Sequence, residues 1–169
     1  MDLTTTFNQH QTYTIHTTAF TQTKQLSGIT TQLLHQGQPI GEATVYLAPE
    51  GLSDEALLTY LDEIELLAVE LFDVAQDQKR IAKQIKQHPF AYLTNLTIHP
   101  EHQNQGLGSL LLNNIVTTLE ENQIPNLYLV SVANTSREQQ KLHHFYTHHY
   151  FTYLMPNHPA KPAVMHRAI

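Results

Sequence analysis

Apolar and polar residues alternate with two different periods along this chain. Runs of β-branched and apolar residues with a period near two are typical of strands. Seven such runs predict strands at residues 12–17, 28–35, 41–48, 92–98, 127–132, 151–155 and 163–169. The segment Gln36-Gly37-Gln38-Pro39 is rich in turn residues and predicts the turn of a hairpin. The polar residues 18–27 predict a short connection with at most one helical turn.

Apolar residues at steps of three and four predict helices in three other segments. These segments are residues 53–87, 107–119 and 138–149. Ser53 is a suitable N-cap for the first of them, and Pro89 follows its end. Residues 53–87 are enough for two helices, with the break expected at 73–78. The mixture of strands and helices, without repeats or a visible boundary, predicts one α/β domain over residues 1–169.

Composition narrows the range of functions. The 169 residues include no cysteine, which excludes disulfides, thiolate metal sites and a cysteine nucleophile. The formal net charge of −6 argues against a nucleic-acid partner and mildly favours cationic substrates. No apolar run approaches the roughly 20 residues that a membrane helix needs, and the N-terminus lacks a signal-peptide pattern. The expected location is therefore the cytoplasm, without membrane attachment.

The stretch from Leu96 to Leu112 carries the clearest functional pattern. A strand is expected to end at Pro100, and a polar loop then leads into a helix that begins at Leu107. Gly106 and Gly108 lie where the loop becomes the helix. Backbone N–H groups at a helix start have no intrahelical partner, and the helix dipole is positive there. The sequence therefore predicts a strand–loop–helix site for an anion such as phosphate.

The spacing within this loop decides between known kinds of phosphate site. A P-loop requires a Gly-Lys-Ser/Thr ending, and the loop contains no lysine. The dinucleotide fingerprint requires a third glycine, and Leu111 stands in its place. The pattern is Gln103-x-x-Gly106-x-Gly108, which resembles the acyl-CoA pyrophosphate loop of the GNAT-family N-acetyltransferases. A plain strand–loop–helix turn with glycines kept for packing is the simpler alternative.

The resemblance implies a fold and a mode of acyl-CoA binding. The implied fold is a GNAT-like mixed, mostly antiparallel sheet that is splayed at the acyl-CoA site and flanked by helices. In that family the main chain of the central strand pairs with the pantetheine arm, a role that falls here on Leu96, Thr97 and Ile98. The residues implied to bind the pyrophosphate are Gln103, Asn104, Gln105, Gly106, Leu107, Gly108 and Ser109.

A second part of the resemblance lies near the C-terminus. Residues 145–151 match the family's Phe-Tyr-x-x-x-Gly-Phe ending, except that Tyr150 replaces the glycine. In many members the tyrosine at the position of Tyr146 protonates the leaving thiolate, which implies that Tyr146 is the catalytic acid. The alternative is a packed tyrosine whose hydroxyl is satisfied elsewhere. Asn134 is implied to contact CoA, although it lies further from Tyr146 than is usual in the family.

The sequence does not identify a general base. Some family members carry a Glu or His six or four residues before the position of Ile98, where this chain has Tyr92 and Thr94. These two side chains share one face and are suited to hold a water molecule. That water would pass the proton to bulk solvent or to a carboxylate, and the candidates are Glu42, Glu63, Glu65 and Glu70. For each of these acids a solvated surface position is the simpler interpretation.

No metal site is expected. His144 and His148 are spaced to share one face of a helix, but no third ligand is apparent. Exposed histidines are the simpler explanation.

The predicted function is direct transfer of an acetyl group from acetyl-CoA to a primary amine of a small molecule or peptide. A homodimer is possible by analogy with the family, and the identity of the acceptor stays open. One alternative is a non-catalytic acyl-CoA-binding or sensor domain of the same fold. Another is an interaction protein that uses the helical segment 53–87.

Overall fold

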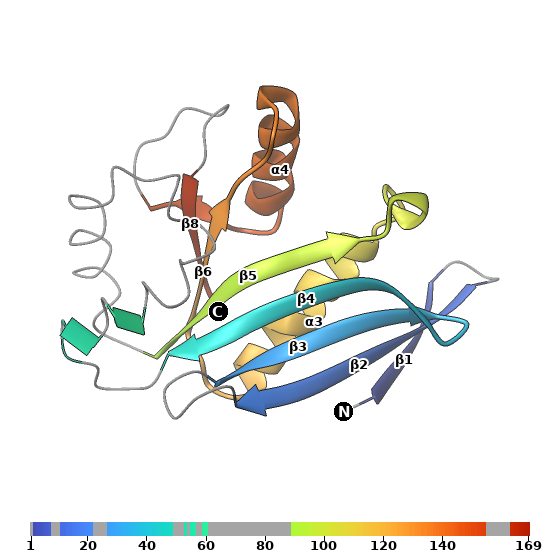
Figure 1. Ribbon diagram of the computed structural model, residues 1–169, viewed down its shortest axis with the longest axis horizontal. Coiled ribbons are helices and arrows are strands. Elements are labelled where there is room, and N and C mark those ends of the chain that lie inside the picture. Colours follow the sequence, from blue (N-terminus) through green and yellow to red (C-terminus); the bar gives the residue numbers. More distant parts are fainter. Residues whose placement is uncertain are drawn as a thin grey trace. The chain divides into compact units, whose positions relative to one another are not determined.

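The computed structural model describes residues 2–7, 11–21, 27–48, 53, 55–56, 59–60, 89–154 and 163–169; for 2–7 and 11 it describes the backbone alone. The chain divides into two compact units. Figure 1 labels their helices and strands. The first unit comprises Met1–Leu47 and Leu93–Gln123. The second comprises Ala48–Tyr92 and Ile124–Ile169. Strand β5 (Phe90–Ile98) contributes its last six residues to the first unit and its first three to the second.

The first unit is an antiparallel sheet with one helix. Its strands are β1 (Asp2–Phe7), β2 (Gln11–Thr21), β3 (Ser27–His35), β4 (Gln38–Ala48) and the end of β5, in that order across the sheet. Threonine and other β-branched residues are frequent in β2 and β3, as a pleated surface favours. Adjacent pairs from β1 to β4 run antiparallel. Ile40 faces His99 and Thr44 faces Thr94, so β4 and β5 are antiparallel as well.

The β3–β4 hairpin contains a tight turn and a bulge. Gln36 and Gly37 both have positive φ, 52° and 77°, which a two-residue turn between twisted strands requires. The predicted turn was too long, because residues 38 and 39 already belong to β4. The register shifts between Leu33 and Leu34, which leaves Ile40 as an extra residue in β4. Ile40 accepts a hydrogen bond at its carbonyl from the His99 N–H, 2.7 Å away.

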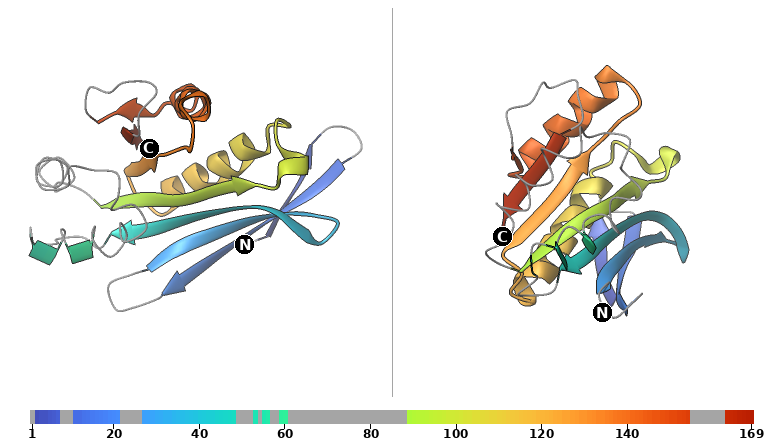
Figure 2. Two further views of the ribbon diagram at one scale, coloured as in Figure 1. Left: turned by 45° about the horizontal axis from the view of Figure 1, so that its top comes forward. Right: turned by 60° about the vertical axis from the view of Figure 1, so that its left-hand side comes forward.

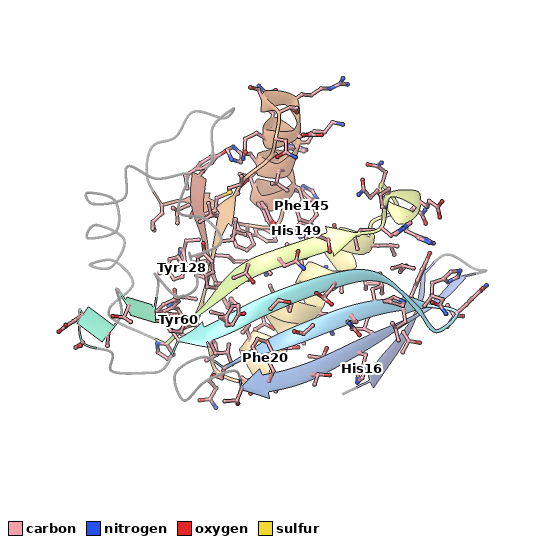
Figure 3. The ribbon with its side chains drawn as sticks, in the orientation of Figure 1. His16, Phe20, Tyr60, Tyr128, Phe145 and His149 are labelled. Atoms are coloured by element: carbon pink, nitrogen blue, oxygen red, sulfur yellow. The ribbon has the colours of Figure 1, made fainter. Side chains whose placement is uncertain are left out.

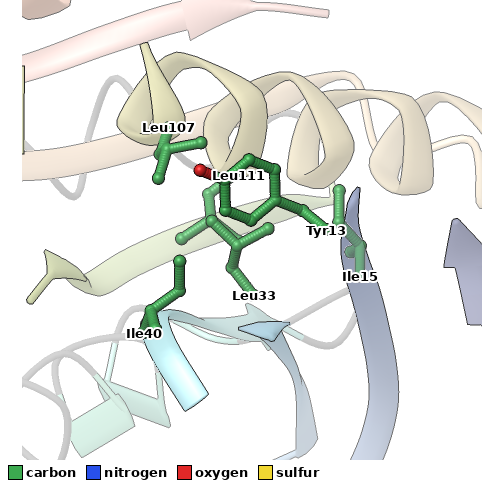
Figure 4. Packing of buried hydrophobic residues seen from close by; sticks show 6 residues of the cluster. All are labelled: Tyr13, Ile15, Leu33, Ile40, Leu107 and Leu111. Carbon is green, nitrogen blue, oxygen red and sulfur yellow. The ribbon is translucent and has the colours of Figure 1, made fainter. Parts of the chain in front are cut away.

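Helix α3 (Leu107–Glu121) runs along one face of these strands (Figure 2). The core between helix and sheet is apolar (Figure 4), and it consists of Tyr13, Ile15, Leu33, Ile40, Leu107 and Leu111. Leu96, Ile98 and Leu110 pack at its margin. Apolar side chains of this size each stabilise the fold by about 1.5–3 kcal/mol on burial. The helix is therefore fixed at its first turn, close to the glycine loop.

The second unit contains β6 (Asn126–Ser131), α4 (Ser136–His148), β7 (Thr152–Tyr153) and β8 (Ala163–Ala168). Strand β8 pairs antiparallel with β6 on one side and β7 on the other. A row of aromatic side chains fills part of its core. Tyr60 and Tyr128, labelled in Figure 3, each meet the ring of Phe90 edge to face, and Tyr128 stacks on His166 at 4.7 Å.

Most predicted elements are confirmed, with corrections at their ends. The chain has an additional strand, β1, and β2 continues to Thr21, so residues 18–21 form no helical turn. Helix α4 begins at Ser136 rather than 138, and the strand expected at 151–155 is only Thr152–Tyr153 before the described residues end at 154.

The helical segment predicted at 53–87 lies mostly outside the described residues. Residues 55, 56, 59 and 60 are helical, and Ala56 N–H donates to Ser53 Oγ at 3.1 Å. The expected cap at Ser53 is therefore confirmed.

Candidate functional site

The glycine loop of the first unit turns the chain from β5 into α3 in two steps. A single 3₁₀ turn, η2 (Pro100–His102), follows the strand. Asn104 and Gly106 then adopt left-handed backbone conformations, with φ of 60° and 80°. Gly106 is the N-cap of α3, and glycine adopts this conformation without steric cost. The spacing of the motif thus corresponds to the backbone reversal that starts the helix.

Glutamine side chains brace this loop from within. Gln103 Nε2 donates to the carbonyl of Ile98 at 2.9 Å, which ties the motif's first residue to the end of β5. Gln105 Nε2 donates to the carbonyl of Glu101 at 3.3 Å. Residues 103–106 are all exposed. In this arrangement the two side chains shape the loop, and the main chain is left as its ligand-binding surface.

The start of α3 has the features of an anion site. Gly106 supplies no side-chain cap to the first turn, and that turn contains no acidic residue. Leu107 is 1% exposed and anchors the helix start in the core, so the following N–H groups have a fixed direction. The helix dipole adds a positive potential at this end. Gly106, Leu107, Gly108 and Ser109 therefore form a main-chain site suited to phosphate oxygens.

The end of β5 lies beside this loop in the same unit. Leu96 and Ile98 turn their side chains to the core, whereas Thr97 is exposed on the other face. The three residues are thus held by packing on one side and by pairing with β4 on another. The structure brings Leu96–Ile98 and the loop 103–109 together within the first unit.

Three histidines lie at the base of the loop, a feature that the sequence interpretation did not include. The ring of His102 is 5.8 Å from that of His35 and 6.2 Å from that of His99, measured between centroids. His35 ends β3, so the register of the sheet creates this cluster. Among the described residues, no group of three or more His, Asp or Glu side chains is arranged to hold a metal ion.

Tyr146 belongs to α4 in the second unit. Its side chain is 7% exposed and lies against the rings of Phe145 and Phe151. Burial raises the pKa of the Tyr146 phenol to about 12, so the hydroxyl remains protonated at neutral pH. Tyr150, which replaces the family's glycine, has a φ of 65°, the left-handed conformation that glycine tolerates best. The substitution therefore preserves the backbone turn after α4.

Asn134 is exposed in the turn between β6 and α4. The buried Gln139 supports this turn: its Oε1 accepts from Ala133 N–H at 2.7 Å, and its Nε2 donates to the Ser131 carbonyl at 3.0 Å. Thr135 caps α4 by accepting the Glu138 N–H at 3.2 Å and donating to the Glu138 carboxylate at 3.0 Å. The Thr-x-x-Glu spacing of this capping box was present in the sequence and would have placed the helix start correctly.

The positions considered for a general base differ in their surroundings. Tyr92 is buried, and the Thr94 hydroxyl donates to the Thr44 carbonyl at 3.3 Å. Of the four carboxylates considered, Glu42 is described, and Glu63, Glu65 and Glu70 lie outside the described residues. The rings of His144 and His148 stack at 6.4 Å on α4.

Comparisons with known proteins agree with this geometry. A family model described as "Acetyltransferase (GNAT) family" matches residues 3–151. No curated protein matches the sequence at a significant level. Among the described residues, no helix has both the length and the apolar character needed to cross a membrane.

Solved structures show the same fold at low sequence identity. The ribosomal-protein-S18-alanine N-acetyltransferase from Escherichia coli is 17% identical, with a TM-score of 0.51 over 88% of this chain and 72% of that one. A GNAT-family acetyltransferase from Streptococcus pneumoniae is 17% identical, with a TM-score of 0.51 over 84% and 67%. Arabidopsis thaliana Naa50, in complex with the bisubstrate analogue CoA-Ac-MVNAL, is 13% identical, with a TM-score of 0.50 over 83% and 72%.

The chain covers 60% of PaiA N-acetyltransferase from Thermoplasma acidophilum, which was crystallised with coenzyme A. The likenesses to the E. coli, S. pneumoniae and A. thaliana structures confirm the predicted fold class, a mostly antiparallel sheet flanked by helices.

Proposed function

Because the chain belongs to the GNAT family of acetyltransferases, we propose that it transfers an acetyl group from acetyl-CoA to a primary amine of a small molecule or peptide. The observation that carries this proposal is the loop 103–109. It combines the family's glycine spacing with a helix start that has no side-chain cap and no acidic residue. The CoA pyrophosphate would accept hydrogen bonds from the main chain at this point.

The central strand supplies the second part of the proposed donor site. The main chain of Leu96, Thr97 and Ile98 would pair with the pantetheine arm as an added strand does. A backbone N–H donated to the thioester oxygen would strengthen as negative charge develops there during attack. Since the side chains of Leu96 and Ile98 are held in the core, this main-chain donor would be fixed before the substrate arrives.

The proposed reaction needs no covalent intermediate on the protein. The neutral amine nitrogen attacks the thioester carbon, a C–N bond forms, and the C–S bond then breaks. Before the attack, the ammonium form of the acceptor releases one proton to solvent or to a carboxylate. After the attack, the nitrogen loses a second proton and the CoA sulfur gains one, so the products are an amide and free CoA thiol. This chain contains no cysteine to accept the acetyl group, which supports direct attack.

Tyr146 would act on the leaving sulfur as a hydrogen-bond donor. With a pKa of about 12, the Tyr146 phenol is a weaker acid than an ordinary thiol, whose pKa is about 8.5. Complete proton transfer from the phenol to the thiolate is therefore uphill. A hydrogen bond from the neutral phenol still stabilises the charge that builds on sulfur as the C–S bond breaks. For Asn134 the proposed role is the contact with CoA that the family resemblance implies.

Calorimetric titration of acetyl-CoA into the wild-type protein and a Gly106→Glu variant tests the proposal. The added carboxylate would stand beside the pyrophosphate, so we expect affinity to fall roughly 100-fold or more. Gly37→Glu is the matched control: its φ of 77° is close to the 80° of Gly106, and no heavy atom lies within 4 Å of an added Cβ. Equal binding by both variants, or no binding by the wild type, would contradict the loop assignment.

A non-catalytic acyl-CoA-binding domain is the second candidate. It is favoured by Tyr92 and Thr94, which occupy positions where some family members have a general base. The two functions differ in thiol release: an enzyme produces free CoA thiol with some member of a primary-amine panel, and a sensor binds acetyl-CoA and releases none. An interaction role for residues 53–87 rests on residues outside the described ones.

A further inference from the structure

An open groove of about 410 Å³ lies in the first unit where β4 begins and β5 ends. It is lined by Pro39, Ile40, Gly41, Glu42, Thr97, Ile98, His99 and Pro100. Its volume falls within the range of small-molecule sites. The extra residue Ile40 bends β4 at this point, and its carbonyl is bonded to the His99 N–H. The groove is therefore built from paired main chain rather than from a loose loop.

Glu42 is the one carboxylate in the groove lining. Gln32 Nε2, from β3, donates to Glu42 Oε2 at 3.1 Å, and Asn95 Nδ2, from β5, donates to Oε1 at 3.5 Å. Amides on both flanking strands thus fix the direction of this side chain. An ionised carboxylate has about four acceptor positions, so two donors leave capacity for a ligand.

The carboxylate lies on the face of the sheet away from α3. A Cβ added at Gly41 would lie 3.3 Å from Leu111 Cδ1 of α3, so position 41 points to the helix. Successive residues of a strand point to opposite faces, which turns Glu42 to the other side. Thr97, Thr44 and Phe20 are exposed or half-buried on that side. Phe20, labelled in Figure 3, meets the ring of Tyr46 edge to face.

The chemistry of the lining suits one class of ligand. The exposed rings of Pro39 and Pro100 provide apolar surface, and Glu42 provides a negative charge. The lining contains no lysine or arginine that would neutralise it. An alkylammonium group has the complementary structure, a positive head with three donors on an apolar stem. The negative formal charge of the chain, −6, acts in the same direction.

We infer that this groove binds the alkylammonium end of the acceptor, with the Glu42 carboxylate as its charge partner. Calling the ligand an acceptor rests on the proposed function, whereas binding of an alkylammonium ion does not. Asn95, which orients Glu42, is adjacent to Leu96, the first residue of the main chain proposed to hold the acyl donor. Glu42 thus lies on the strand next to the proposed donor site.

The test uses hexylamine as the probe and hexanol as its uncharged counterpart. Binding of each is detected by NMR of the backbone amides in the full chain. We expect hexylamine, but not hexanol, to shift the amides of Gly41, Glu42, Thr97 and His99. Glu42→Gln should weaken hexylamine binding roughly 10- to 100-fold, the range for a lost hydrogen bond to a charged group. Glu121→Gln removes the same charge from an exposed site on α3 and should change binding less than twofold.

Glu42→Asp keeps the charge and should retain most of the affinity, which separates a charge contact from a structural role. Absence of the hexylamine shifts in the wild type would overturn the inference, as would equal binding by Glu42→Gln. If Glu42→Gln fails to fold, two comparisons still test the inference. One is hexylamine against hexanol in the wild type, and the other is hexylamine binding by the wild type against Glu42→Asp. Titration with acetyl-CoA tests the proposed function separately. Hexylamine binding without acetyl-CoA binding would contradict the proposed function and would still support the groove assignment.

Discussion

Tyr146 shows how burial changes the chemistry of a single residue. Its ring packs against Phe145 and Phe151, and among the described residues burial is what raises the pKa of its phenol, to about 12. Desolvation alone therefore fixes the hydroxyl as a neutral donor across the physiological range. A residue in this state is suited to stabilise charge on a leaving group and is unsuited to act as a base.

Tyr146→Phe removes the hydroxyl and keeps the ring. If the proposed role is correct, kcat should fall roughly 10- to 100-fold, as expected for loss of a donor to a charged group. The Kd of acetyl-CoA should stay within about twofold. Tyr153→Phe, at a position that is 37% exposed, is the control and should change neither quantity. An unchanged kcat in Tyr146→Phe would remove Tyr146 from the mechanism.

The same variant should alter the alkaline stability of the protein. The pKa of the phenol rises from 10.0 to about 12 on folding, so the folded state holds its proton more tightly than the unfolded state. This difference contributes about 2–3 kcal/mol to the free energy of unfolding below about pH 10. The contribution is lost as the pH rises from about 10 to about 12. Urea unfolding at pH 9 and pH 11.5 should show a smaller decrease for Tyr146→Phe than for the wild type.

Gln123 offers a test of backbone strain at the end of α3. It follows the C-cap Asn122 and has a φ of 58°, a conformation that costs a residue with a Cβ about 1 kcal/mol. Gln123→Gly should therefore increase the free energy of unfolding by about 0.5–1 kcal/mol, measured by urea titration. Glycine at exposed Asn113, in the helix interior, is the opposite control and should destabilise the protein by about 0.3–0.5 kcal/mol.

At the scale of elements, a single side chain joins α4 to the end of β6. Gln139 is 1% exposed and bonds the Ala133 N–H, the Ser131 carbonyl and the Ser131 hydroxyl, and its Nε2 lies 2.7 Å from His143 Nε2. Because an amide nitrogen donates and does not accept, its two hydrogens are shared among Ser131 O, Ser131 Oγ and His143 Nε2, which are the acceptors in these contacts. The network thus ties α4 to the end of β6 through one buried amide.

Gln139→Leu keeps the volume of this side chain and removes its polar atoms. Several buried polar groups would lose a partner at once, so we expect a loss of about 2–4 kcal/mol in the free energy of unfolding. Exchange of the Ala133 amide proton with deuterium should also accelerate, because that N–H is bonded to Gln139 Oε1. A variant that is as stable as the wild type, with unchanged exchange at Ala133, would show that the network contributes little.

Sequence patterns predicted the elements with strong periodicity and missed the features that depend on register. The start of α3 at Leu107 was correct because glycine spacing and the apolar stripe agree there. Leu112 and Val116 are buried beside Leu111 and Ile115, which widens the apolar face of the helix. The pairing of Gln32 and Asn95 with Glu42 joins three strands, so it requires the sheet register that local patterns do not contain. The His35–His102 contact was missed for the same reason.

At the scale of the whole molecule, charge is distributed unevenly. The described residues of the first unit contain no lysine or arginine, and its acidic residues are Asp2, Glu42, Glu101, Glu120 and Glu121. Acetyl-CoA is an anion, so it meets a repulsive field on approach to a chain of net charge −6. A cationic amine meets an attractive one.

The two proposed substrates should therefore respond to salt in opposite directions. Raising NaCl from 20 to 300 mM should increase the association rate constant of acetyl-CoA by roughly twofold, because salt screens the repulsion. Over the same range, the KM of a cationic amine should rise. Stopped-flow binding and steady-state kinetics measure the two quantities. A steep decrease in the acetyl-CoA association rate with salt would show that cationic side chains guide the donor.

The glycine loop presents main chain where many phosphate sites present lysine or arginine. Reagents that inactivate such sites by modifying guanidinium or amino groups therefore have no target between His99 and Ser109. Side chains at positions 103–105 would act on a phosphate only through the path of the backbone, which Gln103 and Gln105 brace. What must persist is the path of the backbone through Gly106, so a relative with quite different loop residues can retain the same binding surface.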